Sequence, residues 1–125
     1  MKLKMVFQKL LWALQRSHRW PALRRKTLKA CGQCAACGST RHLVVHHIKP
    51  FHLYPELELD PKNLIVLCET PGVNCHLRIG HGREWTLWNP SVVRDAALVR
   101  SHPSMRTTVC ISARSAAFNA RPASD

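Results

Sequence analysis

Four cysteines fall into two pairs whose spacing is typical of a zinc site. Cys34 and Cys37 form a Cys-x-x-Cys pair followed by Gly38, and Cys68 and Cys75 form a second pair further along the chain. Four thiolates complete the tetrahedral coordination of a Zn²⁺ ion and leave no position for a substrate. We therefore expect these cysteines to hold a structural zinc ion that stabilises the fold and does not take part in catalysis.

Spacing alone leaves two other interpretations of the cysteines open. Cys31, Cys34 and Cys37 are evenly spaced, so a Cys31/Cys34 pair competes with the Cys34/Cys37 pair. The cysteines could also be buried free thiols, since the second pair is spaced more widely than zinc ligands usually are. The chain has 6 cysteines in 125 residues, a lower density than in a small disulfide scaffold, which favours a metal over disulfides. Cys110 is expected to be a free thiol.

Two adjacent histidines, His46 and His47, are candidates for reaction chemistry. They end a β-branched segment, and successive residues of a strand point to opposite faces, so we infer that one imidazole binds a metal and the other acts as a base. The chain has only three Asp residues, which argues against a two-metal site built from carboxylates. Neutral imidazole suits Zn²⁺, Mn²⁺, Ni²⁺ or Co²⁺ better than Mg²⁺. The histidines expected to be ordinary surface or core residues are His18, His42, His52 and His102.

Two short strands and a loop must position these side chains. The segment 43–48 is rich in β-branched residues and predicts a strand that Pro50 ends, and 64–67 predicts a second strand. A proline-containing loop joins them and closes on a turn over residues 60–63. A short helix is expected from about Asn74 to Ile79, because glycines follow it.

Further helices are predicted on both sides of this segment. Apolar residues recur with helical spacing over 3–14, and a second helix is expected after Ser17, with Pro21 in its first turn. A third helix is expected after Asn89, which resembles an N-cap because Pro90 follows it. The chain is thus expected to be α+β, with helices at both ends.

The positive charge is concentrated at the start of the chain. The formal net charge is +12, residues 1–30 contain nine basic residues and no acidic one, and residues 31–90 are neutral overall. This charge indicates a polyanionic partner, nucleic acid rather than a membrane. Phosphate contact and a solvated basic face both remain open for the four basic residues of the second expected helix, which are Arg24, Arg25, Lys26 and Lys29.

The order of these motifs resembles the HNH endonuclease family. The matching segments are Val45-His46-His47-Ile48-x-Pro50, Asp60-Pro-x-Asn63-Leu64-x-x-Leu67-Cys68 and Asn74-Cys75-His76, followed by Gly80-His81-Gly82, Trp85 and Trp88-Asn89-Pro90. The resemblance covers about residues 31–90 and is closest to small stand-alone proteins of phages and bacteria. It implies a ββα-metal (His-Me finger) motif of the kind that carries a structural zinc site with two cysteine pairs.

The resemblance also implies a role for each residue of the motif. His47 takes the place of the general base, and His46 stands where many members have an aspartate that binds the catalytic metal. Asn63 either ties the loop between the strands or approaches the metal. His76 is the last letter of the motif and a metal ligand. His81 is a further ligand or a phosphate contact, although its spacing of five residues from His76 leaves the i, i+4 face of an α-helix.

The implied activity is metal-dependent hydrolysis of DNA phosphodiester bonds, nicking being one possible form, with 5′-phosphate and 3′-hydroxyl products. The cofactors would be structural Zn²⁺ and one catalytic divalent ion, namely Mn²⁺, Ni²⁺, Zn²⁺ or Mg²⁺. The alternatives are a non-catalytic zinc-containing DNA-binding module and an accessory that acts with a phage terminase or another packaging protein. We expect a basic helical arm over 1–30, a nuclease domain over 31–100 and a disordered tail over 101–125. The absence of a signal peptide or membrane span predicts a cytoplasmic location in a bacterial or phage-infected cell.

Overall fold

The computed structural model describes residue 4 and residues 16–106 and 116–117. The amphipathic helix expected over 3–14 and most of the tail expected to be disordered therefore lie outside the described residues. The first described helix, α2, spans Trp20–Cys31, with Pro21 in its first turn as predicted. It ends at Gly32, whose φ of 66° is left-handed and whose N–H donates to the carbonyl of Leu28.

A two-stranded antiparallel sheet forms the centre of the fold. The strands are β1, Leu43–His47, and β2, Leu64–Cys68, and each ends within one residue of its predicted boundary. Leu43 pairs with Cys68 and His47 pairs with Leu64, so the cysteine and the histidine lie at opposite ends of the hairpin. The loop between the strands contains two 3₁₀ turns, Pro55–Leu57 and Pro61–Asn63.

The short helix expected after Asn74 is present, but it is a π-helix over His76–Gly80. The last long helix, α3, spans Val92–Ser101 and begins later than predicted, with Ser91 in the N-cap position. Asn89 still supplies the predicted cap contact two residues before this N-cap, because its side-chain oxygen accepts from the backbone N–H of Ser91 at 2.9 Å. Its side-chain amide also donates to the carbonyl of Ile79 and to the fully buried carboxylate of Asp95, which ties α3 to the π-helix.

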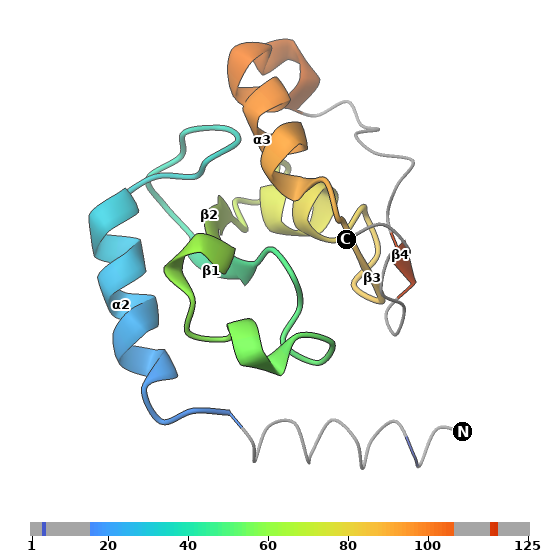
Figure 1. The fold of residues 1–125 in the computed structure, drawn as a ribbon. Helices are drawn as coiled ribbons and strands as arrows, with labels where there is room; N and C mark the ends of the chain where they lie inside the picture. Colours follow the sequence, from blue (N-terminus) through green and yellow to red (C-terminus); the bar gives the residue numbers. More distant parts are fainter. Residues whose placement is uncertain (1–3, 5–15, 107–115, 118–125) are drawn as a thin grey trace.

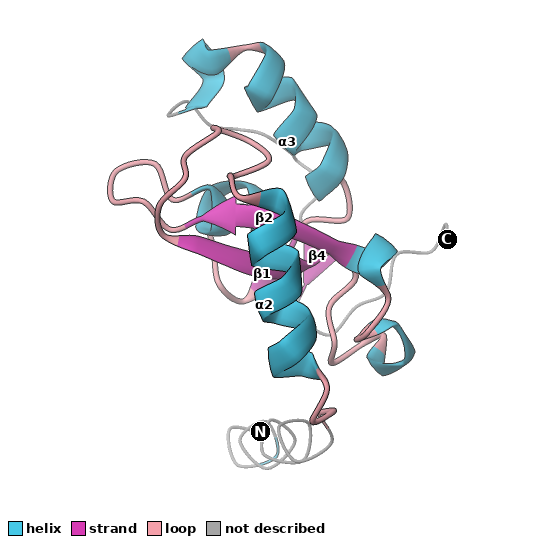
Figure 2. Cartoon of the chain, turned by 90° about the vertical axis from the view of Figure 1, so that its left-hand side faces the viewer, coloured by secondary structure: helices cyan, strands magenta, loops and turns pink. Residues whose placement is uncertain are grey.

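The elements surround the hairpin on two sides. α2 lies along one side of β1 and β2, and the π-helix and α3 lie on the other (Figures 1 and 2). A third strand, β3, Leu87–Trp88, pairs with β4, Ala116–Ala117, and Pro103–Arg106 forms a 3₁₀ helix after α3. This α+β arrangement, two strands followed by a helix with helices at either side, confirms the predicted fold class.

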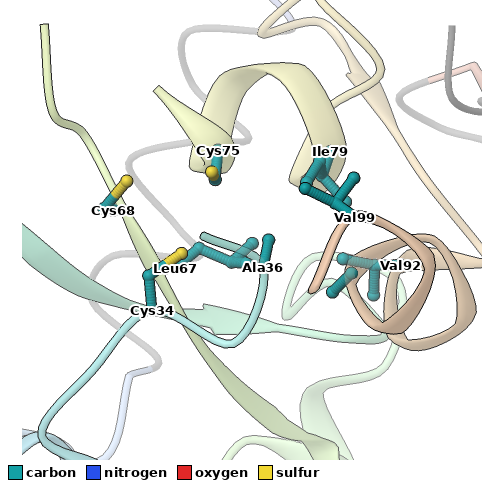
Figure 3. Packing of buried hydrophobic residues seen from close by; sticks show 9 residues of the cluster. Cys34, Ala36, Leu67, Cys68, Cys75, Ile79, Val92 and Val99 are labelled. Carbon is teal, nitrogen blue, oxygen red and sulfur yellow. The ribbon is translucent and has the colours of Figure 1, made fainter. Parts of the chain in front are cut away.

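The hydrophobic core is small and includes cysteines. Three of its nine buried members are Cys34, Cys68 and Cys75, which pack beside Leu67 and Ile79 (Figure 3). A core of this size leaves much of the folding free energy to be supplied by another interaction, such as a bound metal.

Among the helices of the described residues, none combines the length and the apolar character that crossing a bilayer requires.

Candidate active site and metal centres

The structure brings the four predicted zinc ligands together at one end of the hairpin. Cys34, Cys37, Cys68 and Cys75 lie with their sulfur atoms within 4.8 Å of one another, and all four are free thiols. The sulfurs of Cys37 and Cys68 are 3.6 Å apart. This separation is far too long for a disulfide, and it is close to the spacing of about 3.8 Å that tetrahedral Zn–S bonds of about 2.3 Å require.

Hydrogen bonding within the cysteine cluster favours a thiolate. The Cys75 thiol donates to the sulfur of Cys34, and the backbone N–H of Cys37 lies 3.5 Å from the same sulfur; both contacts lower the pKa of Cys34. Thiolate is the form that binds zinc. Cys31 is exposed at the end of α2 and is not part of this cluster, so the structure groups Cys34 with Cys37.

A second cluster contains three histidines at the other end of the hairpin. His46 comes from the end of β1, and His76 and His81 come from the first residue and the C-cap of the π-helix. One nitrogen of each ring lies within 4.8 Å of the others. Burial lowers the pKa of all three imidazoles, which favours the neutral form that binds a metal.

Hydrogen bonds of His76 and His81 orient one nitrogen of each of these two rings for a cation. Nδ1 of His76 lies 3.1 Å from a carboxylate oxygen of Glu69, and Nδ1 of His81 lies 2.7 Å from the carbonyl of Leu87. These contacts leave Nε2 as the free nitrogen in both rings. Nε2 of His46 is buried without a hydrogen-bond partner among the described residues. A buried nitrogen left unpaired beside two other imidazoles fits a divalent metal ion, because histidine ligands are usually oriented by an acceptor that hydrogen-bonds to the other ring nitrogen.

The π-helix explains why His81 joins the cluster. We expected a spacing of five residues to separate His76 from His81, because an α-helix returns to the same face after three or four residues. The π-helix instead bonds residue i to residue i+5, and the N–H of His81 donates to the carbonyl of His76 at 3.1 Å. The five-residue spacing therefore places both rings on one face of the π-helix, and the separation expected for an α-helix does not occur.

His47 is not a member of the three-histidine cluster and has different partners. Its ring packs against Trp20 of α2 at 4.5 Å between centroids, and its Nε2 lies 3.0 Å from the carbonyl oxygen of Glu58. A carbonyl can only accept, so Nε2 carries the hydrogen and Nδ1 keeps its lone pair. Burial lowers the pKa of His47 despite the opposing hydrogen bond, so the ring is neutral and able to take a proton.

His47 and the three clustered histidines line the same cavity, whose volume is about 450 Å³. Arg16 and Arg24 add positive charge to its wall, and Phe51 and Trp88 add apolar surface. The guanidinium carbon of Arg16 lies 4.6 Å from the centre of the Phe51 ring. A cavity that combines neutral imidazoles with guanidinium groups suits a phosphate diester, which needs both a proton acceptor and cationic partners.

Asn63 ties the loop between the strands. Its side-chain oxygen accepts from the backbone N–H of Lys49 at 2.8 Å, and its amide donates to the carbonyls of Lys49 and Leu57. Of the two roles the resemblance implies, these contacts match the tying of the loop. The bond from Asn63 to the carbonyl of Leu57 closes the short loop that contains Glu58, whose carbonyl orients His47.

Three side chains near the site have contacts that the sequence pattern does not indicate. Trp20 packs on His47, and the buried carboxylate of Glu58 accepts from the backbone N–H of Ser17 at 3.0 Å. Trp85 packs against His76 and His81. The sequence around these three residues gives little indication of the contacts, because the contacts depend on how α2 and the loop before β3 pack.

The four basic residues singled out on the second helix are all exposed on α2, namely Arg24, Arg25, Lys26 and Lys29. Only Arg24 also lines the cavity. Arg24 therefore links this basic face of α2 to the cavity.

In the comparison with known proteins, one region of the chain matches a family model. Residues 31–82 match the family model for HNH endonuclease, and this range contains both cysteine pairs and every histidine that lines the cavity. Searches of curated proteins and of solved structures found no match.

Proposed function

Since residues 31–82 form an HNH domain, we propose that the protein is a metal-dependent endonuclease that hydrolyses phosphodiester bonds of DNA. One observation supports this proposal above all. A neutral imidazole with a free Nδ1, His47, lines the same cavity as a cluster of three histidines able to hold a divalent ion. A protein that only bound DNA would need neither arrangement.

The chain's own residues provide most of the chemistry of hydrolysis. A divalent ion held by His46, His76 and His81 would supply positive charge to the phosphate and to the leaving 3′ oxygen. His47 accepts a proton at Nδ1 from a water molecule whose oxygen forms a new bond to phosphorus. The bond between phosphorus and the 3′ oxygen breaks, that oxygen takes a proton from solvent, and the phosphate remains on the 5′ side. The carbonyl of Glu58 holds the tautomer of His47 that this step requires.

A nicking assay tests the proposal directly. Supercoiled plasmid is incubated with the protein and Mg²⁺, Mn²⁺, Ni²⁺ or Zn²⁺ in turn, and relaxed and linear products are resolved on a gel. We expect cleavage that chelator abolishes, with the ions that imidazole prefers more effective than Mg²⁺. DNA binding without cleavage in any of these ions would instead favour a non-catalytic module.

The four cysteines are proposed to hold a structural zinc ion. Their sulfur spacing and the hydrogen bonds to Cys34 support this assignment. An action with a phage terminase or another packaging protein, a cytoplasmic location and the division into an arm, a nuclease domain and a tail remain predictions from the sequence.

Replacing Arg16 with alanine is expected to lower kcat/KM roughly 10- to 100-fold, the range for loss of one charged hydrogen bond. Arg16 lines the cavity, and its Nε lies 3.9 Å from the Glu58 carboxylate, so its charge is only partly balanced. Arg41→Ala is the matched control, because Arg41 is exposed and does not line the cavity. Equal losses in the two variants would contradict a specific role for Arg16, and Arg16→Lys measures how much of the effect is charge alone.

Replacing Arg25, Lys26 and Lys29 together with alanine is expected to weaken DNA binding and flatten its dependence on salt. For duplex DNA, the slope of log K against log salt should fall by about 0.9 for every phosphate that no longer has a cationic partner. Fluorescence anisotropy of a labelled duplex over a range of salt concentrations measures this slope. An unchanged slope would mean that these three side chains form only a solvated face.

A further inference from the structure

Trp85 is a large aromatic side chain exposed beside the histidine cluster. It is 50% exposed, and the other large exposed hydrophobic residues of the described chain, Val93 and Leu98, lie on α3. The ring of Trp85 lies 5.1 Å from that of His76 and 5.0 Å from that of His81, measured between centroids. One part of the indole thus packs on two of the candidate metal ligands, and the rest faces solvent.

The turn that presents Trp85 is held firmly to the π-helix. The N–H of Arg83 donates to the carbonyl of Leu77 at 2.9 Å, and the His81 ring binds the carbonyl of Leu87 at 2.7 Å. Gly82 and Arg83 both have positive φ, 58° and 81°, and this conformation is strained for arginine. An exposed tryptophan fixed by a strained, hydrogen-bonded turn is organised to contact something outside the protein.

We infer that Trp85 stacks on a base of the DNA next to the scissile phosphate, and that the preferred substrate is DNA whose bases are unstacked there. This inference rests on the proposed nuclease function. A phosphate placed at the three histidines carries its sugar and base into the space beside them, where the indole lies. In an intact duplex each base already stacks on both sides, so only a single strand, a gap or a mismatch leaves a base face free for Trp85.

Two substitutions separate stacking from packing. Trp85→Phe and Trp85→Leu both leave an apolar side chain against His76 and His81, but only phenylalanine offers a flat face to a base. Leu98→Ala is the control for removing an exposed apolar side chain elsewhere. The metal content of every variant is measured, so that loss of the metal is seen separately from loss of stacking.

The experiment compares kcat/KM on a single-stranded oligonucleotide and on the same strand fully paired. The wild type should have the higher kcat/KM on the single strand. Trp85→Leu should lower kcat/KM on the single strand about tenfold, mainly by raising KM, and should change kcat/KM on the duplex little. Trp85→Phe should keep most of the activity, and Leu98→Ala should match the wild type. Equal activity of the Phe and Leu variants, or equal losses on both substrates, would overturn the inference.

The proposed nuclease function can fail separately from this inference. If the wild type cuts neither substrate, the nuclease proposal fails, and stacking is then tested by binding. Anisotropy of a labelled single strand should still show weaker binding by Trp85→Leu than by Trp85→Phe. Identical affinities of these two variants would reject the stacking role as well.

Discussion

Replacing His47 with glutamine is expected to reduce the rate of DNA cleavage by roughly 10²- to 10⁴-fold, the range for loss of a general base. The glutamine amide can still donate to the carbonyl of Glu58, as Nε2 of His47 does, but it has no basic nitrogen to take a proton from water. The variant should therefore fold and bind metal and DNA as the wild type does. Single-turnover cleavage of plasmid DNA at saturating metal measures the effect.

Two further variants make the result on His47 specific. His47→Ala removes the base and also the ring that packs on Trp20, so a similar rate in the alanine and glutamine variants would assign the loss to the proton acceptor. His18→Ala removes an exposed histidine near the start of α2 and should leave the rate unchanged. Cleavage by His47→Gln within about threefold of the wild type would exclude His47 as the base.

Replacing both Cys34 and Cys68 with alanine is expected to remove the bound zinc and to unfold the domain. Structural zinc contributes about 10–16 kcal/mol of apparent binding free energy, as much as or more than the roughly 5–15 kcal/mol by which a whole domain is stable. Both side chains are also part of the small core. Elemental analysis should find one tightly held zinc in the wild type and none in the double variant, and circular dichroism should show the loss of structure.

The exposed Cys31 provides the control for the zinc site. Cys31→Ala removes a thiol that lies outside the cluster, so zinc content and melting temperature should stay as in the wild type. Wild-type protein without zinc, or a double variant with an unchanged melting temperature, would exclude the assignment. The alternative in which the four cysteines are merely buried thiols predicts the first of these outcomes, wild-type protein without zinc.

The sequence predicted the features that depend on local pattern. Both strands, the loop turn before Asn63 and the pairing of Cys34 with Cys37 follow from β-branched runs, turn residues and spacing, and the structure contains all of them. The proximity of the cysteine pairs could be anticipated for a similar reason. An antiparallel hairpin brings the residues that precede one strand close to those that follow the other.

The features that the sequence did not reveal depend on backbone geometry or on packing between distant segments. Regular helix periodicity gave no reason to place His81 beside His76, because the hydrogen-bond pattern of a π-helix leaves no mark in residue types. The partner of His47 is a main-chain carbonyl, and every residue has one. The position of Trp20 follows from how α2 packs on the hairpin, which no local pattern encodes.

Glu58 takes part in two contacts that respond differently to sequence change. Its carbonyl orients His47, and its carboxylate accepts from Ser17 at the start of the segment that leads into α2. Substitution at position 58 can remove the second contact but not the first, since any residue supplies a carbonyl. During evolution, the attachment of the basic N-terminal segment could therefore change or disappear while the proton acceptor kept its orientation. The proposed contacts with DNA and the proposed proton acceptor can thus change independently in evolution, although both depend on one residue.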